Sequence, residues 1–302
     1  MSTTAQGQSD DRGLRTIATG LGFTEGPVAL ADGSLVVTSL THGAVYRVRS
    51  DGGHERIATV GGGANGAAAD RHGVLYIAQS GGRWVRNGPS WPPGHEGGVQ
   101  RIRADGSVEW VSRDPISPND ICFGPDGLLY VTDPTRSPRI RDGRLWRIDP
   151  STGDAELLFS TPWFCNGLAF GVDDILYLAS TYESRVYAVD VSVSGPRPRA
   201  VFDLVEGQPD GLAVDSRGNI VVGAIDATRA RAGSVQTYTA TGQLLDVFRP
   251  GPDCHYTNIA FDGRGGLVIT SSDEESVLLA TRWGDPGLTL HPFRRAPSQA
   301  RK

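Results

Sequence analysis

The stretch that decides the fold is Asp210-Gly211-Leu212-Ala213-Val214, which is followed by a polar turn and the apolar run 220–222. A polar anchor, a short apolar strand, an Asp/Gly turn and a second apolar strand recur along the 302-residue chain. The anchors of the six copies lie 40–54 residues apart and are Glu25, Asn65, Asn119, Asn166, Asp210 and Asn258. Each copy continues into a third strand and a fourth. Four short strands per unit at this period are typical of propeller blades.

The sequence therefore predicts an all-β fold, a six-bladed β-propeller with four-stranded antiparallel blades. One domain is expected over residues 14–293, with flexible tails at 1–13 and 294–302. Residues 14–19 resemble a fourth strand that has no blade before it, so pairing onto the last blade would close the ring and remove open sheet edges. Residues 288–293 compete for the same position.

Composition excludes several classes of protein. With 40 Gly and 19 Pro, a helical bundle is excluded, because both residues weaken helix interiors. A net charge of −5 and 21% charged residues indicate neither disorder nor a nucleic-acid or membrane-surface partner. There is no long apolar run, no secretory signal pattern, and the three Cys form no disulfide framework. We expect a cytoplasmic protein, a monomer or small homo-oligomer.

The anchors have a common geometry in such a fold. In each blade the chain enters the innermost strand at its anchor, so the six side chains should ring the central channel at one face. Two carboxylates and four carboxamides would form an oxygen cage of the kind that Ca²⁺ accepts. Zinc usually recruits His or Cys, and no anchor is either. The alternative is that Asn, Asp and Gly merely form repeated turns. We expect one divalent ion, Ca²⁺ ahead of Mg²⁺, Mn²⁺ or Zn²⁺.

Four segments carry a more specific resemblance: 23–27, 117–120, 165–167 and 208–215. They resemble the hallmark segments of the SMP-30/gluconolactonase/luciferin-regenerating-enzyme-like family, and the resemblance covers residues 14–293. It implies a six-bladed propeller that binds one divalent ion and hydrolyses lactones. By the same resemblance Glu25, Asn166 and Asp210 match metal ligands, and Asn119 matches a position that contacts substrate or completes the metal shell. Animal members carry an Arg where Ser117 stands.

Long loops should surround the channel mouth on the face of the anchors. Loops 80–97, 133–142 and 226–232 join second to third strands, and further residues precede the inner strands. Such loops on a rigid scaffold usually set specificity. The substrate-contact candidates are Trp163, His255, Trp91 and Tyr256. Their aromatic character favours a small-molecule substrate with an apolar or planar part, although Trp also often packs over the base of a loop.

The combined expectation is a divalent-metal-dependent hydrolase that opens a lactone or related ester. Asp210 is the candidate general base, because the ion can tune its proton affinity, and His255 is the next candidate. Glu25 would be mainly a ligand, and Asn119 would position the substrate. Three alternatives stay open: a phosphotriesterase-like hydrolase, a metal-dependent biosynthetic lyase or isomerase, and a non-catalytic Ca²⁺-binding propeller.

Overall fold

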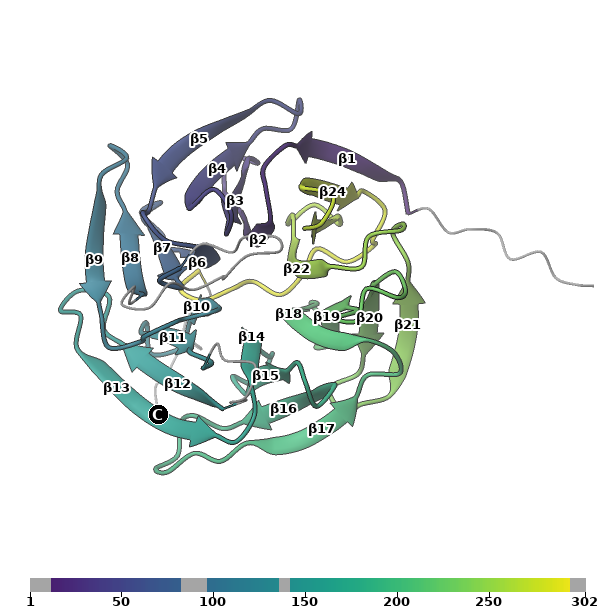
Figure 1. The fold of residues 1–302 in the computed structure, drawn as a ribbon. Coiled ribbons are helices and arrows are strands. Elements are labelled where there is room, and N and C mark those ends of the chain that lie inside the picture. Colours follow the sequence, from purple (N-terminus) through teal and green to yellow (C-terminus); the bar gives the residue numbers. More distant parts are fainter. Residues whose placement is uncertain (1–11, 83–96, 136–141, 294–302) are drawn as a thin grey trace, which may run out of the picture.

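Each sequence repeat forms one four-stranded antiparallel sheet, and six such sheets surround a common axis (Figure 1). The computed structural model describes residues 12–82, 97–135 and 142–293, and every regular element in those ranges is a strand. The prediction of a six-bladed all-β propeller is confirmed. Within the same ranges there is no helix with the length and apolar character needed to cross a membrane.

Five blades consist of consecutive strands, ordered from the axis outward. The first blade contains β2 (Thr24–Ala29), β3 (Leu35–Ser39), β4 (Ala44–Val48) and β5 (His54–Thr59). The second contains β6 (Ala64–Ala69), β7 (Leu75–Gln79), β8 (Gly98–Ile102) and β9 (Val108–Ser112). The third contains β10 (Ile121–Phe123), β11 (Leu129–Thr132), β12 (Gly143–Ile148) and β13 (Ala155–Thr161). The fourth contains β14 (Cys165–Phe170), β15 (Leu176–Ser180), β16 (Arg185–Val189) and β17 (Arg199–Asp203). The fifth contains β18 (Gln208–Val214), β19 (Ile220–Ile225), β20 (Ser234–Tyr238) and β21 (Leu244–Phe248).

The sixth blade closes the ring with strands from both ends of the chain. It contains β22 (Tyr256–Phe261), β23 (Leu267–Ser271) and β24 (Ser276–Ala280), and its outer strand is β1 (Leu14–Thr19). Leu14 pairs with Ala280 and Thr19 with Ser276. The strand before the first blade thus covers the open edge of the last one, which removes an edge that could otherwise pair with another chain.

The competing segment near the C-terminus is not a strand. Residues 286–293 cross the channel opening, visible in Figure 1 as the yellow segment at the centre of the ring. Leu288 donates its N–H to the carbonyl of Val214 at 2.9 Å, and His291 Nε2 lies 3.1 Å from Asp174 Oδ1. Because β1 already occupies the edge of the sixth blade, this segment binds across blades instead.

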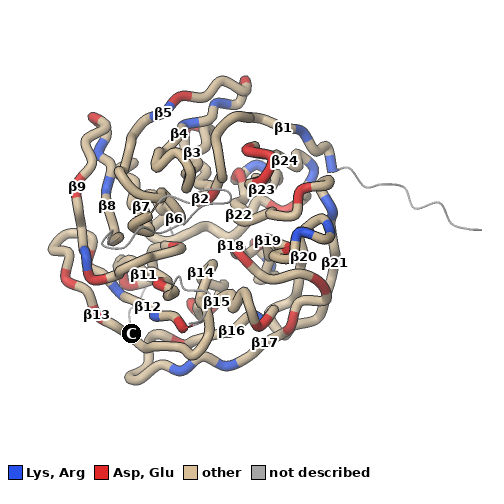
Figure 2. Tube along the Cα trace, viewed as in Figure 1, with Lys and Arg blue, Asp and Glu red and all other residues tan. Residues whose placement is uncertain are grey.

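Hydrophobic burial is concentrated between neighbouring blades. All five residues of β3 are buried, whereas in the outer strand β5 only Ala58 is fully buried. One apolar cluster joins Tyr177 and Val186 of the fourth blade to Leu212 and Ile220 of the fifth. Burying one such side chain contributes roughly 1.5–3 kcal/mol. Figure 2 shows Lys/Arg and Asp/Glu positions of both signs distributed around the outer strands. Because apolar clusters fill the space between blades, each inner strand packs against the blade on either side of it. The anchors stand at one end of these strands.

Candidate functional site

The six anchors lie at the same end of the six innermost strands. Each is at the second or third position of its strand, except Asn119, which stands two residues before β10. Their side chains are nearly inaccessible, with exposed fractions between 2% and 7%. The six anchors are therefore buried polar residues at one end of the inner strands.

A β-bulge, rather than a turn, holds five of the anchors. In β2 the pairing with β3 advances from Glu25↔Thr38 to Val28↔Val36, so one extra residue stands on the inner strand. The same shift occurs in β6, β14, β18 and β22. Bulges bend a strand and re-aim side chains, and they are common beside functional sites. Five of the six anchors therefore stand in bulged strands and not in turns.

The glycine that follows most anchors permits close contact between blades. A Cβ at Gly66 would lie within 3.0 Å of Asp120 Oδ1, and one at Gly167 would lie as close to the carbonyl oxygen of Asp210. Real Cβ atoms essentially never approach other atoms so closely. Each glycine thus lets the polar group of the next blade come up against the inner strand.

Buried carboxylates converge at this ring. Burial raises the pKa of Glu25 well above its usual range, and the charges of Asp210 and Asp120 raise it further. Burial also raises the pKa of Asp120 to about 6, against hydrogen bonds that favour its charged form. The side chain of Asn258 is hydrogen-bonded to both Glu25 and Asp120 and lowers both pKa values. Carboxylates that repel one another in a buried site favour a bound cation.

Asp120 is a site residue that the sequence analysis missed. It stands where four other repeats carry glycine after the anchor, at Gly26, Gly66, Gly167 and Gly211. An acidic residue in place of a repeated glycine is the signal that could have identified it. Its Oδ1 accepts the N–H of Ile121 at 2.9 Å, which orients the carboxylate.

The amide side chains leave oxygen atoms available. Asn166 donates from Nδ2 to Thr181 Oγ1 at 2.9 Å, which leaves Oδ1 as the side-chain atom that could bind a ligand. Asn65 Oδ1 is buried with no hydrogen-bond partner within the described part of the chain. The backbone of Asn119 is fixed on both sides, by Thr132 O and Gly66 N, each at 2.7 Å. Carboxylate and amide oxygens that are not used in hydrogen bonds are the ligand atoms that a hard divalent cation accepts.

Farther along the inner strands from the anchors, the channel is mainly apolar. A cavity of about 640 Å³ lies there, lined mainly by apolar residues of all six inner strands and by residues 286–293. Asp120 and the anchor Asn258 line this cavity, whereas Glu25, Asn166 and Asp210 do not. We therefore place the candidate site at the end of the inner strands where the anchors stand; most of loops 80–97 and 133–142 lies outside the described residues.

The four predicted substrate-contact residues have different environments in the structure. Trp163 is 6% exposed and stacks on Tyr187 with a ring separation of 4.5 Å. Tyr256 is 1% exposed and belongs to the apolar cluster between the fifth and sixth blades. Both rings are occupied by packing, so the structure does not bring them together with the anchors. Trp91 lies outside the described residues. His255 is the remaining candidate, 9% exposed, with its ring edge-on to Phe23 at 6.0 Å.

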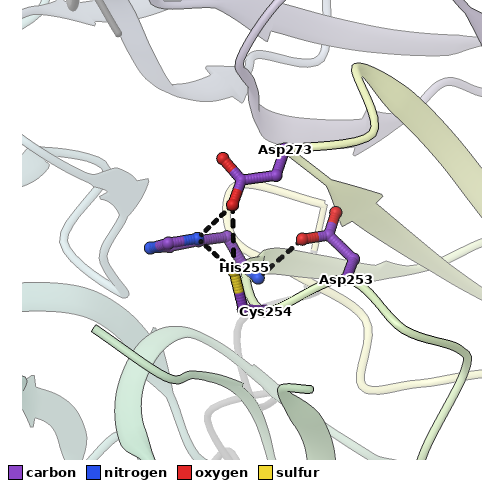
Figure 3. A group of neighbouring side chains, drawn as sticks. All are labelled: Asp253, Cys254, His255 and Asp273. Atoms are coloured by element: carbon purple, nitrogen blue, oxygen red, sulfur yellow. Dashed lines mark hydrogen bonds and ion pairs between the residues drawn. The ribbon is translucent and has the colours of Figure 1, made fainter. Parts of the chain in front are cut away.

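A second polar cluster surrounds His255 (Figure 3). It consists of Asp253, Cys254, His255 and Asp273, whose potential ligand atoms all lie within 4.8 Å of one another. His255 Nδ1 lies 2.8 Å from Asp273 Oδ2, and the Cys254 thiol donates to the same oxygen at 3.0 Å. Asp273 follows β23 and was not predicted, because 18 residues separate it from His255 and no local spacing connects them.

Comparisons with known proteins agree with this architecture. Residues 23–273 match the model of the SMP-30/gluconolactonase/LRE-like region. A gluconolactonase of Zymomonas mobilis is 23% identical, over 89% of this chain and 81% of that protein. A gluconolactonase structure from Xanthomonas campestris superposes with a TM-score of 0.72 at 22% identity, covering 88% of each chain. Regucalcin from Agrobacterium tumefaciens, a calcium-binding protein, gives a TM-score of 0.75 at 15% identity, covering 93% of this chain and 97% of that one. The matched residues span nearly the whole propeller, and the chain belongs to the SMP-30/gluconolactonase/LRE-like family.

Proposed function

We propose that the protein is a divalent-metal-dependent hydrolase that opens a lactone or a related ester. The observation that carries this proposal is the convergence of the buried carboxylates of Glu25, Asp120 and Asp210 at one end of the inner strands. The names of the relatives point the same way, because two of them are gluconolactonases.

Glu25, Asn166 and Asp210 would hold the ion, with Asn119 completing the set. A bound divalent ion supplies a Lewis acid that polarises the substrate carbonyl and makes water more acidic. Ca²⁺ is the ion that mixed carboxylate and amide oxygens favour.

The chain itself supplies the proton acceptor and the orientation of the substrate. Asp210 accepts a proton from the attacking water, because it is a carboxylate among the anchors that would hold the ion and its bound water. Asn119 orients the substrate through its side-chain amide, which forms no hydrogen bond with the described residues. Its backbone is fixed by two hydrogen bonds, so the point from which the side chain extends is set before substrate binds.

The substrate we propose is a small molecule that enters from the loop-bearing face. Phe23 provides an apolar ring two residues before Glu25, next to His255. A substrate with an apolar or planar part would contact this wall while its carbonyl lies at the anchors.

A hydrolysis screen tests the proposal. The purified protein is stripped with a chelator and reloaded separately with Ca²⁺, Mg²⁺, Mn²⁺ or Zn²⁺, then assayed with sugar, aliphatic and aromatic lactones and with phosphotriesters. We expect turnover of at least one lactone class, lost on chelation and restored by the preferred ion. Turnover of phosphotriesters alone, or none with any ion, would contradict the proposal.

A further inference from the structure

We propose that His255 is a second catalytic residue of this site, whose Nε2–H protonates the alkoxide that leaves when a lactone opens, and that Asp273 positions its ring. This inference rests on the hydrolase function proposed above and extends it, because it assigns the protonation of the leaving oxygen to a residue other than the base Asp210.

The backbone of His255 is fixed between two blades. Its N–H donates to Asp253 Oδ1 at 2.8 Å, and its carbonyl accepts the N–H of Ser272 at 3.0 Å. It also forms an isolated bridge with Ile225 at the end of β19. The residue therefore stands where the entry to β22 meets the loop between β23 and β24, on the face that carries the anchors.

The imidazole ring is oriented through one nitrogen and presents the other. Nδ1 lies 2.8 Å from Asp273 Oδ2, whereas Nε2 has no hydrogen-bond partner among residues 12–82, 97–135 and 142–293. In Figure 3 the ring extends away from both carboxylates, with Nε2 at its far end. A carboxylate on Nδ1 fixes the orientation of the ring, so that a proton carried on Nε2 points away from the carboxylates.

Asp273 is itself held as a carboxylate. Its Oδ2 accepts hydrogen bonds from Arg229 Nη1 at 2.7 Å and from the Cys254 thiol at 3.0 Å. Burial raises the pKa of Asp273, but these hydrogen bonds and the charges of His255 and Arg229 lower it to about 2. Two further carboxylates lie near the imidazole among the described residues. Asp253 accepts hydrogen bonds from the backbone and from Ser271, and Asp226 follows β19.

His255 lies close to two of the anchors along the chain. It precedes Asn258 by three residues, a separation of at most about 10 Å. Asn258 is hydrogen-bonded to Glu25, and Phe23, whose ring contacts His255, precedes Glu25 by two residues. His255 therefore lies on the same side of the molecule as these anchors. The proposal requires a lactone to bind with its ring oxygen, which is bonded to the carbonyl carbon, turned toward His255 Nε2.

The proposed step balances in protons and bonds. Water adds to the carbonyl carbon, a C–O bond forms, and the proton of the water goes to Asp210. The bond between the carbonyl carbon and the ring oxygen then breaks, and that oxygen takes the proton from His255 Nε2. Solvent returns the proton from Asp210 to His255. The sum is one lactone and one water converted to one hydroxy acid, with no oxidant or reductant.

A metal ion held by this cluster is the competing interpretation. Tetrahedral zinc would separate its N, O and S ligand atoms by about 3.3–3.5 Å. The observed separations are 2.8 Å for His255 Nδ1 and Asp273 Oδ2, and 3.3 Å for Cys254 Sγ and His255 Nδ1. Both oxygens of Asp253 already accept hydrogen bonds, including one from Ser271 Oγ at 2.6 Å. The spacings are those of hydrogen bonds.

The test compares two six-membered lactones that differ in the leaving group. δ-Valerolactone releases an alkoxide, whereas dihydrocoumarin releases a phenolate, whose conjugate acid has a pKa near 10 and needs little help from an acid. We expect His255→Gln to lower kcat for δ-valerolactone by about 10²–10⁴ and for dihydrocoumarin by less than about tenfold. Asp273→Asn should show the same selectivity to a smaller degree. The matched control is His72→Gln, at an exposed position on the turn between β6 and β7.

Three outcomes would overturn the inference. An equal loss with both lactones would mean that His255 only shapes the pocket, and the hydrolase proposal would stand. Turnover of neither lactone by the wild type, in a screen without any other active lactone, would remove both proposals together. The third is a second equivalent of Co²⁺ with a thiolate charge-transfer band that Cys254→Ser abolishes, since Nδ1 would then be a metal ligand. A wild-type kcat that falls as pH is raised above neutrality, together with a kcat of His255→Gln that does not fall over the same pH range, supports the acid role.

Discussion

Gly211 of the fifth blade lies directly against the side chain of Asn258 in the sixth, because a Cβ on Gly211 would stand within 3.0 Å of Asn258 Oδ1. Asn258 is in turn hydrogen-bonded to the carboxylates of Glu25 and Asp120. The missing side chain of one residue therefore sets where a polar group of the next blade stands, and through it the arrangement of the buried acids.

Replacing this glycine should disturb the ring without breaking the fold. Gly211→Ala forces Asn258 to shift, which we expect to cost about 1–3 kcal/mol of stability, as overpacking does. Affinity for the preferred ion should fall as well, measured by calorimetric titration. Gly251→Ala is the control, since the nearest atom to its Cβ is the Tyr256 hydroxyl oxygen at 3.3 Å. Equal ion affinities in the two variants would show that the ring does not depend on this contact.

Metal removal should destabilise the protein. An ion that binds only the folded state adds RT ln(1 + [L]/Kd), which is about 2.7 kcal/mol at a hundredfold excess over Kd. Chelation should therefore lower Tm, and the preferred ion should restore it, as followed by differential scanning calorimetry. In Glu25→Gln the ion should raise Tm by much less. If neither chelator nor ion changed the Tm of the wild type, no tightly held ion would contribute to the stability of the fold.

Asp210 has two proposed tasks that one substitution separates. As a ligand it can be replaced by Asn, because Ca²⁺ accepts an amide oxygen; as a base it cannot, because an amide takes up no proton near neutral pH. Asp210→Asn should keep the fold and part of the ion occupancy while lowering kcat by about 10²–10⁴. Rates are compared at saturating ion.

The comparison variant for that experiment is Asn119→Ala, which should act through substrate positioning and raise KM or lower kcat with little loss of ion. A wild-type rate in the ion-loaded Asp210→Asn variant would place the base elsewhere.

The closing strand should contribute a large share of the stability. Ile17 of β1 is buried in one cluster with Leu35 and Val48 of the first blade and Val277 of the sixth. Ile17→Ala should cost about 2–5 kcal/mol in urea unfolding, because it opens a cavity at the seam where the ring closes. Leu290→Ala, in the segment that crosses the channel and exposed there, is the contrast and should cost far less. Similar losses in both variants would argue against closure by β1.

The low pKa of Asp273 predicts a loss of stability in acid. Its pKa of about 2 in the folded state lies below the value of about 3.9 for an unfolded Asp. The folded state therefore binds fewer protons, and the stabilisation is complete above pH 4 and disappears as pH falls toward 2. The difference in urea midpoint between wild type and Asp273→Asn should shrink from pH 6 to pH 3. Asp51→Asn, at an exposed turn, should show no such trend.

Much of the fold was readable from local sequence. Alternating apolar strands and Asp/Gly turns act over a few neighbouring residues, so their six-fold recurrence predicted the blades and placed Glu25, Asn166 and Asp210 at equivalent positions. Even the closing strand was a candidate, because residues 14–19 have the alternation of a strand but no blade before them.

Contacts between blades were decided by the tertiary structure alone. Asp120 joins the acids because Gly66 of the preceding blade leaves room for it, and Asp273 meets His255 because the turn after β23 folds over the entry to β22. Trp163 lies in the loop between β13 and β14, as the sequence indicated, but its ring stacks on Tyr187 of β16. A repeat pattern specifies what each blade looks like, since that depends on neighbours along the chain. Which side chains meet in the centre depends on the bulges and on the distance between blades, and these arise only when the ring is closed.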